Sequence, residues 1–268
     1  MKKHILCLGD SNTHGYCADP ADCADHGIRF NEDERWTCRL QTALGSDYLV
    51  TEEGLSGRTT VFVDPIHESM DALSVAYSLL KSHEVIDLLI IMLGTNDVKE
   101  RFNANAACIG AGMERLILKA KSVDCWGTKA PNILVVAPPR IGDGFHDAVM
   151  GEGCVKKSKG VAEQFRIVTE RQNVHFLNAA NCEFNQVDFM HLTRKATHSW
   201  LICWQRKCRR FYNRITSRPG FLLRKPGRFC VQNSRKPASS ETGPSAVFAS
   251  ESEWKISLSR RQELCRGQ

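Results

Sequence analysis

A serine, an aspartate and a histidine have the types and spacing that nucleophilic catalysis needs. Ser11 stands in the segment Gly-Asp-Ser-Asn at residues 9–12, directly after the first apolar run of the chain. Asp188 and His191 are three residues apart, so one turn of the backbone can place the carboxylate beside one ring nitrogen and leave the other nitrogen for a serine. Each residue also has an ordinary structural interpretation, because serine caps helices and Asp–His pairs occur on surfaces.

Two further segments could stabilise negative charge on a reacting oxygen. Gly57, within residues 52–60, can present a bare backbone N–H, and Asn96, in the Gly-Thr-Asn-Asp of residues 94–97, can present a side-chain amide. Donors of these kinds build the oxyanion holes of acyl-transfer enzymes. The structural alternatives are a turn glycine with positive φ and a turn asparagine followed by a helix-capping aspartate.

The elements that must position these residues follow an alternating pattern. Short apolar runs predict buried strands, and longer amphipathic stretches between them predict helices. This alternation is typical of a doubly wound parallel sheet, whose sites form beyond the carboxyl ends of the strands. The four polar segments follow the first, second, third and fifth predicted strands. The predicted strands are residues 4–9, 48–52, 86–93, 132–137 and 174–177, and the predicted helices are residues 34–44, 70–81, 107–121 and 158–171.

The four segments, in this order, resemble those of the SGNH (GDSL-type) hydrolase family, which is named for a Ser, a Gly, an Asn and a His. The resemblance extends over residues 4–193 and is closest to the arylesterase-like branch through residues 5–11, 52–60 and 90–97. It implies an α/β fold, a flavodoxin-like three-layer α/β/α sandwich with a five-stranded parallel sheet. It also implies a serine esterase that hydrolyses or transfers small acyl groups of carboxylic esters through an acyl-enzyme, with no metal and no cofactor.

The same resemblance implies roles for individual residues. Ser11, Asp188 and His191 are the implied catalytic residues, and Ser11, Gly57 and Asn96 are the implied oxyanion hole. The rival serine-hydrolase fold, that of the α/β-hydrolases, requires a Gly-x-Ser-x-Gly elbow, which this chain lacks.

The substrate pocket is expected to form around these residues. We expect residues 138–141 and 152–159 to form two of its walls. The lack of a lid-sized insertion favours substrates with small acyl groups. Asn12 and His14 stand where relatives often carry apolar or aromatic residues, so His14 should change the polarity of the pocket. The residues expected in the pocket are Asp10, Asn12, His14, Thr95, Pro139, Ile141 and Phe189.

Composition excludes several other classes of protein. The chain has 268 residues, of which 42% are hydrophobic and 25% charged, and this is ordinary for a globular protein. Its longest apolar run, residues 85–93, contains Asp87 and is far shorter than the roughly 20 residues of a membrane span. The N-terminus does not read as a signal peptide, so we expect a cytoplasmic protein. Twelve cysteines without zinc-ligand spacing predict scattered free thiols.

The charge of the chain is split between two regions. Residues 1–193 carry 19 Lys and Arg against 26 Asp and Glu, a net charge of −7, whereas residues 194–268 carry 17 against 4, a net charge of +13. Such a shift marks a boundary or an abnormal terminus. We therefore expect a hydrolase domain at residues 1–193 and a basic tail at residues 194–268. The family resemblance ends near Ala196, and the tail resembles the product of a shifted reading frame; a genuine appended segment is the alternative.

The tail supports a second interpretation of function. Apolar residues at helical spacing predict a basic helix at residues 194–217, and the loss of periodicity predicts disorder from about residue 220. The alternative function is that of a catalytically impaired SGNH-fold protein whose basic tail binds nucleic acid or an anionic surface. For the core we expect a small ester as partner, no nucleic acid and no membrane span, and we leave homo-oligomerisation open. The residues that define the helical stripe are Trp200, Trp204, Phe211 and Ile215.

Overall fold

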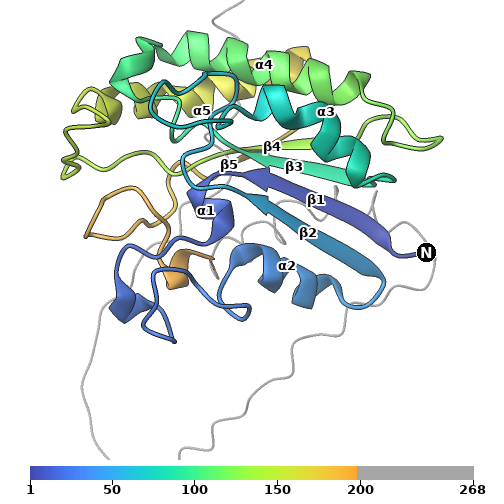
Figure 1. The fold of residues 1–268 in the computed structure, drawn as a ribbon, viewed down its shortest axis with the longest axis horizontal. Helices are drawn as coiled ribbons and strands as arrows, with labels where there is room; N and C mark the ends of the chain where they lie inside the picture. The colour runs from blue at the N-terminus through green and yellow to red at the C-terminus, as the bar shows by residue number, and fades with distance from the viewer. Residues whose placement is uncertain (198–268) are drawn as a thin grey trace, which may run out of the picture. The chain divides into compact units, whose positions relative to one another are not determined.

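Five parallel strands form the central sheet of the computed structural model, which describes residues 1–197 (Figure 1). The strand order is β2-β1-β3-β4-β5, the order of flavodoxin-like doubly wound sheets. The predicted five-stranded parallel sheet is thereby confirmed. The strands are β1 (Lys3–Gly9), β2 (Tyr48–Gly54), β3 (Leu88–Met92), β4 (Ile133–Ala137) and β5 (His175–Asn178).

The strands β1, β3 and β4 are apolar on both faces of the sheet, and this is why they lie in the interior. In β1, Leu6 and Leu8 belong to one hydrophobic cluster, whereas Ile5 and Cys7 belong to a second cluster on the opposite face. The residues of β3 and β4 alternate between the same two clusters. Because both faces are buried, these strands read as nearly continuous apolar runs.

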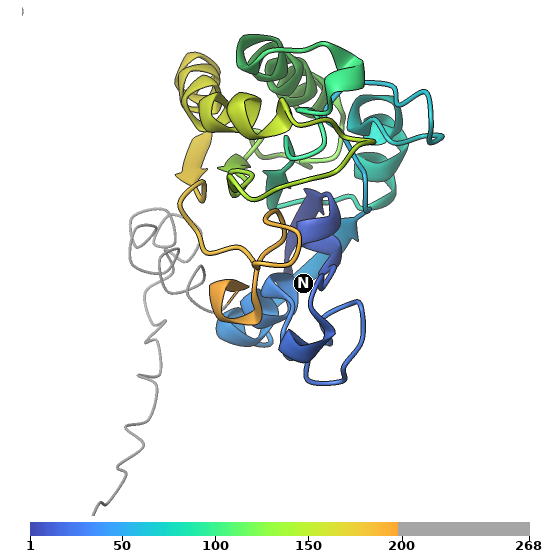
Figure 2. The same ribbon diagram turned by 90° about the vertical axis from the view of Figure 1, so that its left-hand side faces the viewer.

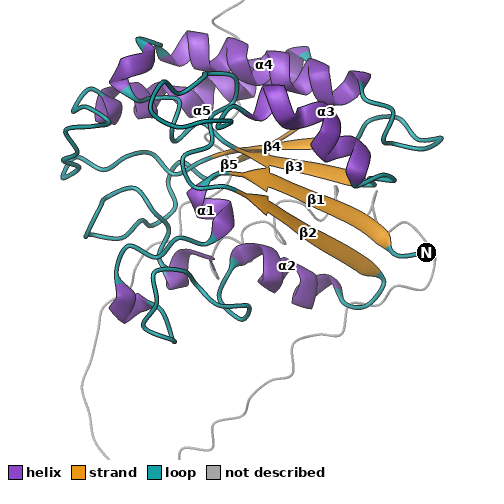
Figure 3. Cartoon of the chain, viewed as in Figure 1, coloured by secondary structure: helices purple, strands orange, loops and turns teal. Residues whose placement is uncertain are grey.

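Helices on both faces of the sheet complete a three-layer α/β/α sandwich (Figure 3). α3, α4 and α5 pack against one face, and α2 packs against the other. The helices are α1 (Ser11–His14), α2 (Trp36–Leu44), α3 (Ala72–Ser82), α4 (Ala106–Ser122) and α5 (Cys154–Arg171), with short 3-10 helices η1 (Pro20–Asp22) and η2 (Glu100–Phe102).

Capping side chains decide where two of these helices begin. The carboxylate of Asp71 accepts a hydrogen bond of 2.8 Å from the N–H of Ser74 at the start of α3. The side chain of Asn105 accepts one of 2.9 Å from the N–H of Cys108 at the start of α4. Both bonds satisfy N–H groups that have no partner within the helix itself.

α5 begins four residues before the predicted start at residue 158, so this prediction was wrong. Lys156 and Lys157 give the segment a polar sequence, but Cys154 is fully buried and continues the buried stripe of the helix by one turn. Most of the predicted wall at residues 152–159 is therefore helix rather than loop. The stripe has the alternating spacing of four and three residues that a helix face requires, and it consists of Cys154, Ser158, Val161, Phe165 and Val168.

The carboxyl ends of the strands meet at one edge of the sheet, and Figure 2 looks onto this edge. β1 and β3 are neighbours there, but the chain leaves β1 toward α2 and leaves β3 toward α4, which lie on opposite faces. Such a topological switch point is where doubly wound sheets bind their ligands. Ser11 follows β1 and Asn96 follows β3, so the two residues flank this point.

A glycine at the end of β2 lets α1 approach the sheet closely. A Cβ atom on Gly54 would lie 2.2 Å from the backbone nitrogen of His14. Because no other residue type avoids this overlap, α1 and Ser11 at its start depend on glycine at position 54.

The packed structure continues past the predicted boundary at residue 193. Residues 194–197 are helical, and the Thr193 hydroxyl accepts a hydrogen bond of 3.0 Å from the N–H of Ala196. The Thr197 hydroxyl donates to the carbonyl of Glu34 at 2.9 Å, and Ala196 is buried. The start of the basic tail therefore packs against the segment that leads into α2.

The other predictions for the tail lie outside the described residues. They concern the rest of the helix at residues 194–217, the disorder from about residue 220, the shifted reading frame and the binding of nucleic acid or an anionic surface. Among the helices of residues 1–197, none combines the length and the apolar composition that crossing a membrane would take.

Candidate active site

Ser11, His191 and Asp188 form a continuous hydrogen-bonded line at the carboxyl edge of the sheet. Ser11 Oγ lies 2.7 Å from Nε2 of His191, and Nδ1 of the same ring lies 2.5 Å from Oδ2 of Asp188. Ser11 and His191 are only 6% and 5% exposed. In this order of groups, the imidazole can take the proton of the hydroxyl while the carboxylate holds the imidazole in place.

Ser11 is the first residue of α1, and the local backbone fixes its position. Asp10 caps the helix, because its Oδ1 accepts the N–H of Asn12 at 3.0 Å. The carbonyl of Ser11 accepts hydrogen bonds of 2.9 Å from both Gly15 and Tyr16. Within residues 1–197 the N–H of Ser11 has no hydrogen-bond partner, as is usual for the first turn of a helix, so it is available to a ligand oxygen.

Asn185 organises the loop that carries Asp188 and His191. Its amide nitrogen donates to Oδ1 of Asp188 at 2.8 Å and to the carbonyl of His191 at 2.9 Å, and its side-chain oxygen accepts the N–H of Asp188 at 2.8 Å. The sequence analysis missed this residue. The available signal was an asparagine three residues before an aspartate in a loop, since such side chains bond to nearby backbone groups.

The loop with His191 is also bonded directly to α1, the helix that begins with the candidate nucleophile Ser11. The N–H of Leu192 donates to the side-chain oxygen of Asn12 at 3.0 Å. Asn12 and Leu192 are the immediate neighbours of Ser11 and His191 in sequence. This bond therefore fixes the distance between the two candidate catalytic side chains.

The environment of Asp188 keeps its carboxylate ionised. Partial burial acts to raise the pKa of Asp188, but the hydrogen bond and the charge of His191, together with the amide of Asn185, outweigh burial and lower this pKa to about 2. An ionised carboxylate at 2.5 Å stabilises positive charge that develops on the ring during proton transfer.

Gly57 and Asn96 provide hydrogen-bond donors on the turns after β2 and β3. Gly57 has φ of +92°, and a Cβ added there would meet only Met70 Sδ at 3.6 Å, so backbone conformation rather than crowding favours glycine. The N–H of Gly57 has no hydrogen-bond partner within the described chain. Asn96 Nδ2 donates to the carbonyl of Arg58 at 3.2 Å, and its second N–H remains for a ligand.

Tyr16 is a further neighbour of the site that the sequence analysis missed. Its ring centroid lies 4.6 Å from that of His191, and the two rings are tilted by 54°. The signal was an aromatic residue five positions after Ser11, but Tyr16 lies in a loop, where hydrophobic periodicity gives no indication of contacts.

Three of the predicted pocket residues support the site from within the protein. Asp10 and Thr95 are 0% and 3% exposed, and burial raises the pKa of Asp10. Asn12 is 3% exposed and makes the bond to Leu192 described above. Their burial leaves little of these side chains for a substrate to touch.

Two other predicted pocket residues have their main contacts in the loops and the core. Burial lowers the pKa of His14, and the positive charge of Arg29 beside it adds to the effect. Ile141 is buried in the cluster beneath α5, and its N–H donates to Ser158 Oγ at 3.0 Å. Within residues 1–197 the structure shows no hydrogen bond from either side chain to Ser11 or His191.

Pro139 and Phe189 complete the predicted pocket. Pro139 is buried after the end of β4. Phe189 is half-buried with φ of +57°, its carbonyl accepts the N–H of Gly142 at 2.8 Å, and it packs on the cluster that contains Ile141. Phe189 thus joins the loop of the candidate catalytic residues to the loop after β4.

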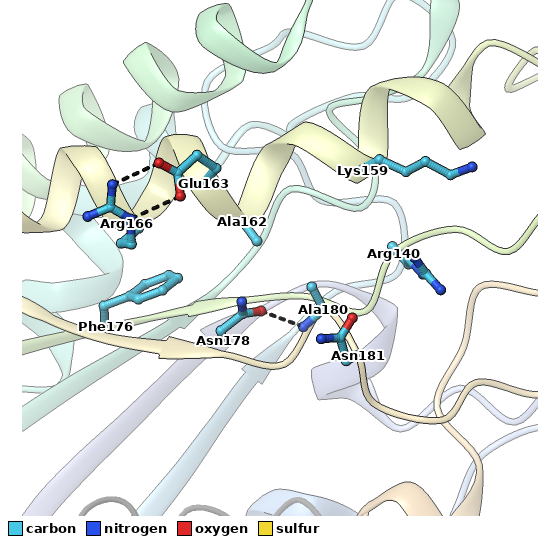
Figure 4. A pocket seen from close by; sticks show the side chains of 9 residues that line it. All are labelled: Arg140, Lys159, Ala162, Glu163, Arg166, Phe176, Asn178, Ala180 and Asn181. Carbon is cyan, nitrogen blue, oxygen red and sulfur yellow. Dashed lines mark hydrogen bonds and ion pairs between the residues drawn. The ribbon is translucent and has the colours of Figure 1, made fainter. Parts of the chain in front are cut away.

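A pocket of about 240 Å³ lies between α5 and the edge strand β5, apart from these residues (Figure 4). Two of its cationic side chains already have partners, because Arg166 pairs with Glu163 and Glu170, and Lys159 pairs with Asp143. It contains no candidate catalytic side chain, and we assign no function to it. The pocket is lined by Arg140, Lys159, Ala162, Glu163, Arg166, Phe176, Asn178, Ala180 and Asn181.

Comparison with known proteins identifies the class to which this fold and site belong. The family model of the GDSL-like lipase/acylhydrolase family matches residues 7–198. The chain belongs to this family, and it is a carboxylic ester hydrolase of the SGNH type. The predicted family resemblance is thereby confirmed. A search among curated proteins found no match.

Solved structures support the same assignment. An aryl esterase from M. smegmatis is 33% identical to this chain, with a TM-score of 0.68 and coverage of 78% of this chain and 99% of that one. The carbohydrate acetylesterase Est24 from Sinorhizobium meliloti is 30% identical, with a TM-score of 0.67 and coverage of 77% and 100%. A lipase/acylhydrolase from Enterococcus faecalis, 18% identical with a TM-score of 0.53, covers 77% of this chain and 95% of its own, and it shares the fold.

Proposed function

We propose that this chain is a serine esterase that hydrolyses small carboxylic esters through an acyl-enzyme on Ser11. The observation that carries this proposal is the pair of short distances from His191, 2.7 Å to Ser11 Oγ and 2.5 Å to Asp188 Oδ2. Together they give a serine hydroxyl a base, and give that base an ionised partner.

In the first half-reaction Ser11 becomes acylated. Nε2 of His191 takes the proton of Ser11 as Oγ bonds to the ester carbonyl carbon, and the carbonyl oxygen becomes an oxyanion. The N–H groups of Ser11 and Gly57 and the amide of Asn96 hold this oxyanion. The carbon–oxygen bond to the alcohol then breaks, and the imidazolium of His191 gives its proton to the departing alkoxide.

In the second half-reaction the acyl group leaves Ser11. Nε2 of His191 takes a proton from water, and the water oxygen attacks the acyl carbon. The same donors hold the second oxyanion. The bond from the acyl carbon to Ser11 Oγ breaks, the proton on His191 returns to Ser11, and the carboxylic acid departs. An alcohol in place of water would give acyl transfer by the same steps.

The burial of the site supports small acyl groups as substrates. Ser11, Asn96 and His191 are only 5–6% exposed, so little of their surface is open to a substrate. The ring of Tyr16 packs on His191 and covers part of it. The aryl esterase and the carbohydrate acetylesterase among the similar structures also favour a short acyl group, and we take acetyl esters of aryl alcohols and sugars as the first substrates to test.

Replacement of the nucleophile tests this proposal. Ser11→Ala should lower the hydrolysis of aryl acetates by at least about 10³-fold, whereas Ser46→Ala, at an exposed serine, should leave the rate unchanged. A fluorophosphonate probe should label the wild-type chain on Ser11, as shown by mass spectrometry of its peptides. Turnover by purified Ser11→Ala above a few per cent of the wild-type rate, or labelling at another residue, would remove Ser11 as nucleophile.

A further inference from the structure

Asp97 is a buried carboxylate that the proposed mechanism does not use. It directly follows Asn96 and is 0% exposed. Its Oδ1 accepts two hydrogen bonds from Thr60, one of 3.0 Å from the backbone N–H and one from the hydroxyl. Its Oδ2 has no hydrogen-bond partner within residues 1–197. A carboxyl group in such a place is costly to keep, and this raises the question of what it contributes.

The free-energy cost of burying the Asp97 carboxylate is reflected in its pKa. Burial raises the pKa of Asp97 to about 6, although both bonds from Thr60 oppose the shift, and the nearby Asp10 adds to it. An apolar or neutral residue would be easier to bury here. The two hydrogen bonds that hold Thr60 are therefore the clearest effect of having a carboxylate at residue 97.

Thr60 belongs to the turn that carries Gly57, so its position matters for the oxyanion. Gly57 follows β2 and Asn96 follows β3, and these strands are not neighbours, because β1 lies between them. Sheet hydrogen bonds therefore do not link the two turns directly. Between residues 57–60 and residues 94–97 the direct links are the bonds from Thr60 to Asp97 and the bond from Asn96 Nδ2 to the carbonyl of Arg58. Farther along the same loops, Asp64 pairs with Lys99 and Arg101.

We propose that Asp97 is a positioning residue for the oxyanion hole, which holds Thr60 and thereby sets the N–H of Gly57 relative to the amide of Asn96. This inference rests on the proposed function. Oxyanion donors act only when they lie about 2.7–3.1 Å from the developing charge. A small displacement of one turn against the other therefore weakens stabilisation of the transition state and leaves the binding of the substrate nearly unchanged.

Two variants weaken the link from opposite sides. Asp97→Asn keeps an acceptor oxygen for Thr60 but removes its charge, which weakens both hydrogen bonds, and Thr60→Val removes the hydroxyl donor and keeps the backbone N–H. Each should lower kcat for an aryl acetate by about tenfold with little change in KM. Thr60→Ser, which retains the hydroxyl, should restore most of kcat.

Asp87→Asn is the matched control. Oδ2 of Asp87 also accepts a backbone N–H, that of His4 at 2.8 Å, but Asp87 lies at the amino end of the sheet, just before β3. Asp87→Asn should change stability and leave kcat unchanged. If it lowers kcat as much as Asp97→Asn does, loss of a carboxylate that accepts a backbone N–H has this effect wherever it lies in the fold, and the proposal is overturned.

A double-mutant cycle with Asn96→Ala completes the test. If Asp97 acts through the oxyanion hole, Asp97→Asn should cost much less in the Asn96→Ala background than in the wild type. Equal factors in both backgrounds, an unchanged kcat, or an effect on KM alone would overturn the proposal. Labelling of Ser11 by a fluorophosphonate in each variant keeps the two hypotheses apart. Labelling at Ser11 with equal factors removes only the role of Asp97, whereas labelling elsewhere removes the proposed function itself.

Discussion

Ser11 is surrounded at the residue scale by partners that lie far from it in sequence. His191 is 180 positions away, yet its Nε2 lies 2.7 Å from Ser11 Oγ. The N–H of Ser11 belongs to the first turn of α1, where backbone donors have no partner within the helix. In the proposed mechanism one residue therefore brings both the nucleophilic hydroxyl and an oxyanion donor, and its neighbours supply the base and the remaining donors.

Asn96→Ala should test the proposed oxyanion donor on the turn that follows β3. The amide gains its full strength only when negative charge forms on the substrate oxygen, so kcat should fall by roughly 10²–10³ with little change in KM. Steady-state hydrolysis of an aryl acetate measures both constants. Asn105→Ala, which removes the cap of α4, is the control and should cost about 1 kcal/mol of stability with kcat retained. A rise in KM alone would make Asn96 a residue of substrate binding.

Asp97 should make the free energy of unfolding of the chain depend on pH. Its pKa rises from the ordinary 3.8 to about 6 on folding, so between these values the folded chain holds a proton that the unfolded chain has lost. The stability that this group contributes is fully present below pH 3.8 and is lost as the pH rises through about 6. From about pH 3 to about pH 7, the free energy of unfolding of the wild type should fall by about 3 kcal/mol relative to Asp97→Asn. Urea unfolding of both proteins measures this difference, and a constant difference would contradict it.

Each strand end contributes one part of the site at the element scale. β1 leads into Ser11, β2 into the turn with Gly57, and β3 into the turn with Asn96. All strands are parallel, so these ends share one edge of the sheet. The loop after β5 crosses this edge to bring His191 to Ser11. The hydrogen bond from the N–H of Leu192 to Asn12 holds the loop against α1.

The contact between α1 and β2 predicts the effect of a small substitution. In Gly54→Ala the new Cβ would lie 2.2 Å from the backbone nitrogen of His14, and a backbone atom cannot turn aside as a side chain can. We expect a loss of about 1–3 kcal/mol of stability together with a lower kcat, because α1 carries Ser11. Gly27→Ala is the control, since its Cβ would have no atom closer than 3.8 Å. Thermal melting and aryl acetate kinetics decide the case, and wild-type values for Gly54→Ala would refute the expectation.

The two parts of the chain carry opposite net charge at the scale of the whole molecule. Residues 1–193 have a net charge of −7 and residues 194–268 one of +13. The first residues of the basic part already pack on the acidic part, since the N–H of Arg194 donates to Asp22 at 2.6 Å and its guanidinium pairs with Glu34 at 3.4 Å. A cut at residue 193 would therefore remove contacts that the described structure contains.

Three chains of different length test the predicted division into domains. A chain that ends at Ser217 should keep the activity and melting temperature of the full chain, because the sequence after about residue 220 has no pattern of core residues. A chain that ends at Thr193 should melt at a lower temperature and lose activity, because Arg194, Ala196 and Thr197 no longer pack near the loop with His191. If removal of residues 218–268 alone abolishes activity, the end of the tail is a functional part of the enzyme and not the product of a shifted reading frame.

The sequence by itself determined the order of strands and helices along the chain, because buried residues recur at the spacing of a strand or of a helix. Apolar runs marked all five strands within a few residues, and a serine, a glycine, an asparagine and an Asp–His pair each followed one of the strands. Parallel strands bring their carboxyl ends to one edge, so these residues could be expected to lie near one another before any coordinates were known. The predicted start of α5 was four residues too late, because Lys156 and Lys157 make this segment polar although Cys154 before them is buried.

Only the tertiary structure decided which side chains touch. Asn185 and Tyr16 lie in loops, where no periodicity reports on contacts, and the link from Asp97 to Thr60 joins residues 37 positions apart. It also showed that Asp10 and Thr95, which the sequence predicts to line a pocket, are buried. The physical reason is that a sequence pattern reports whether a residue faces water or the core, whereas a hydrogen bond depends on distances of a few tenths of an ångström between segments that folding brings together.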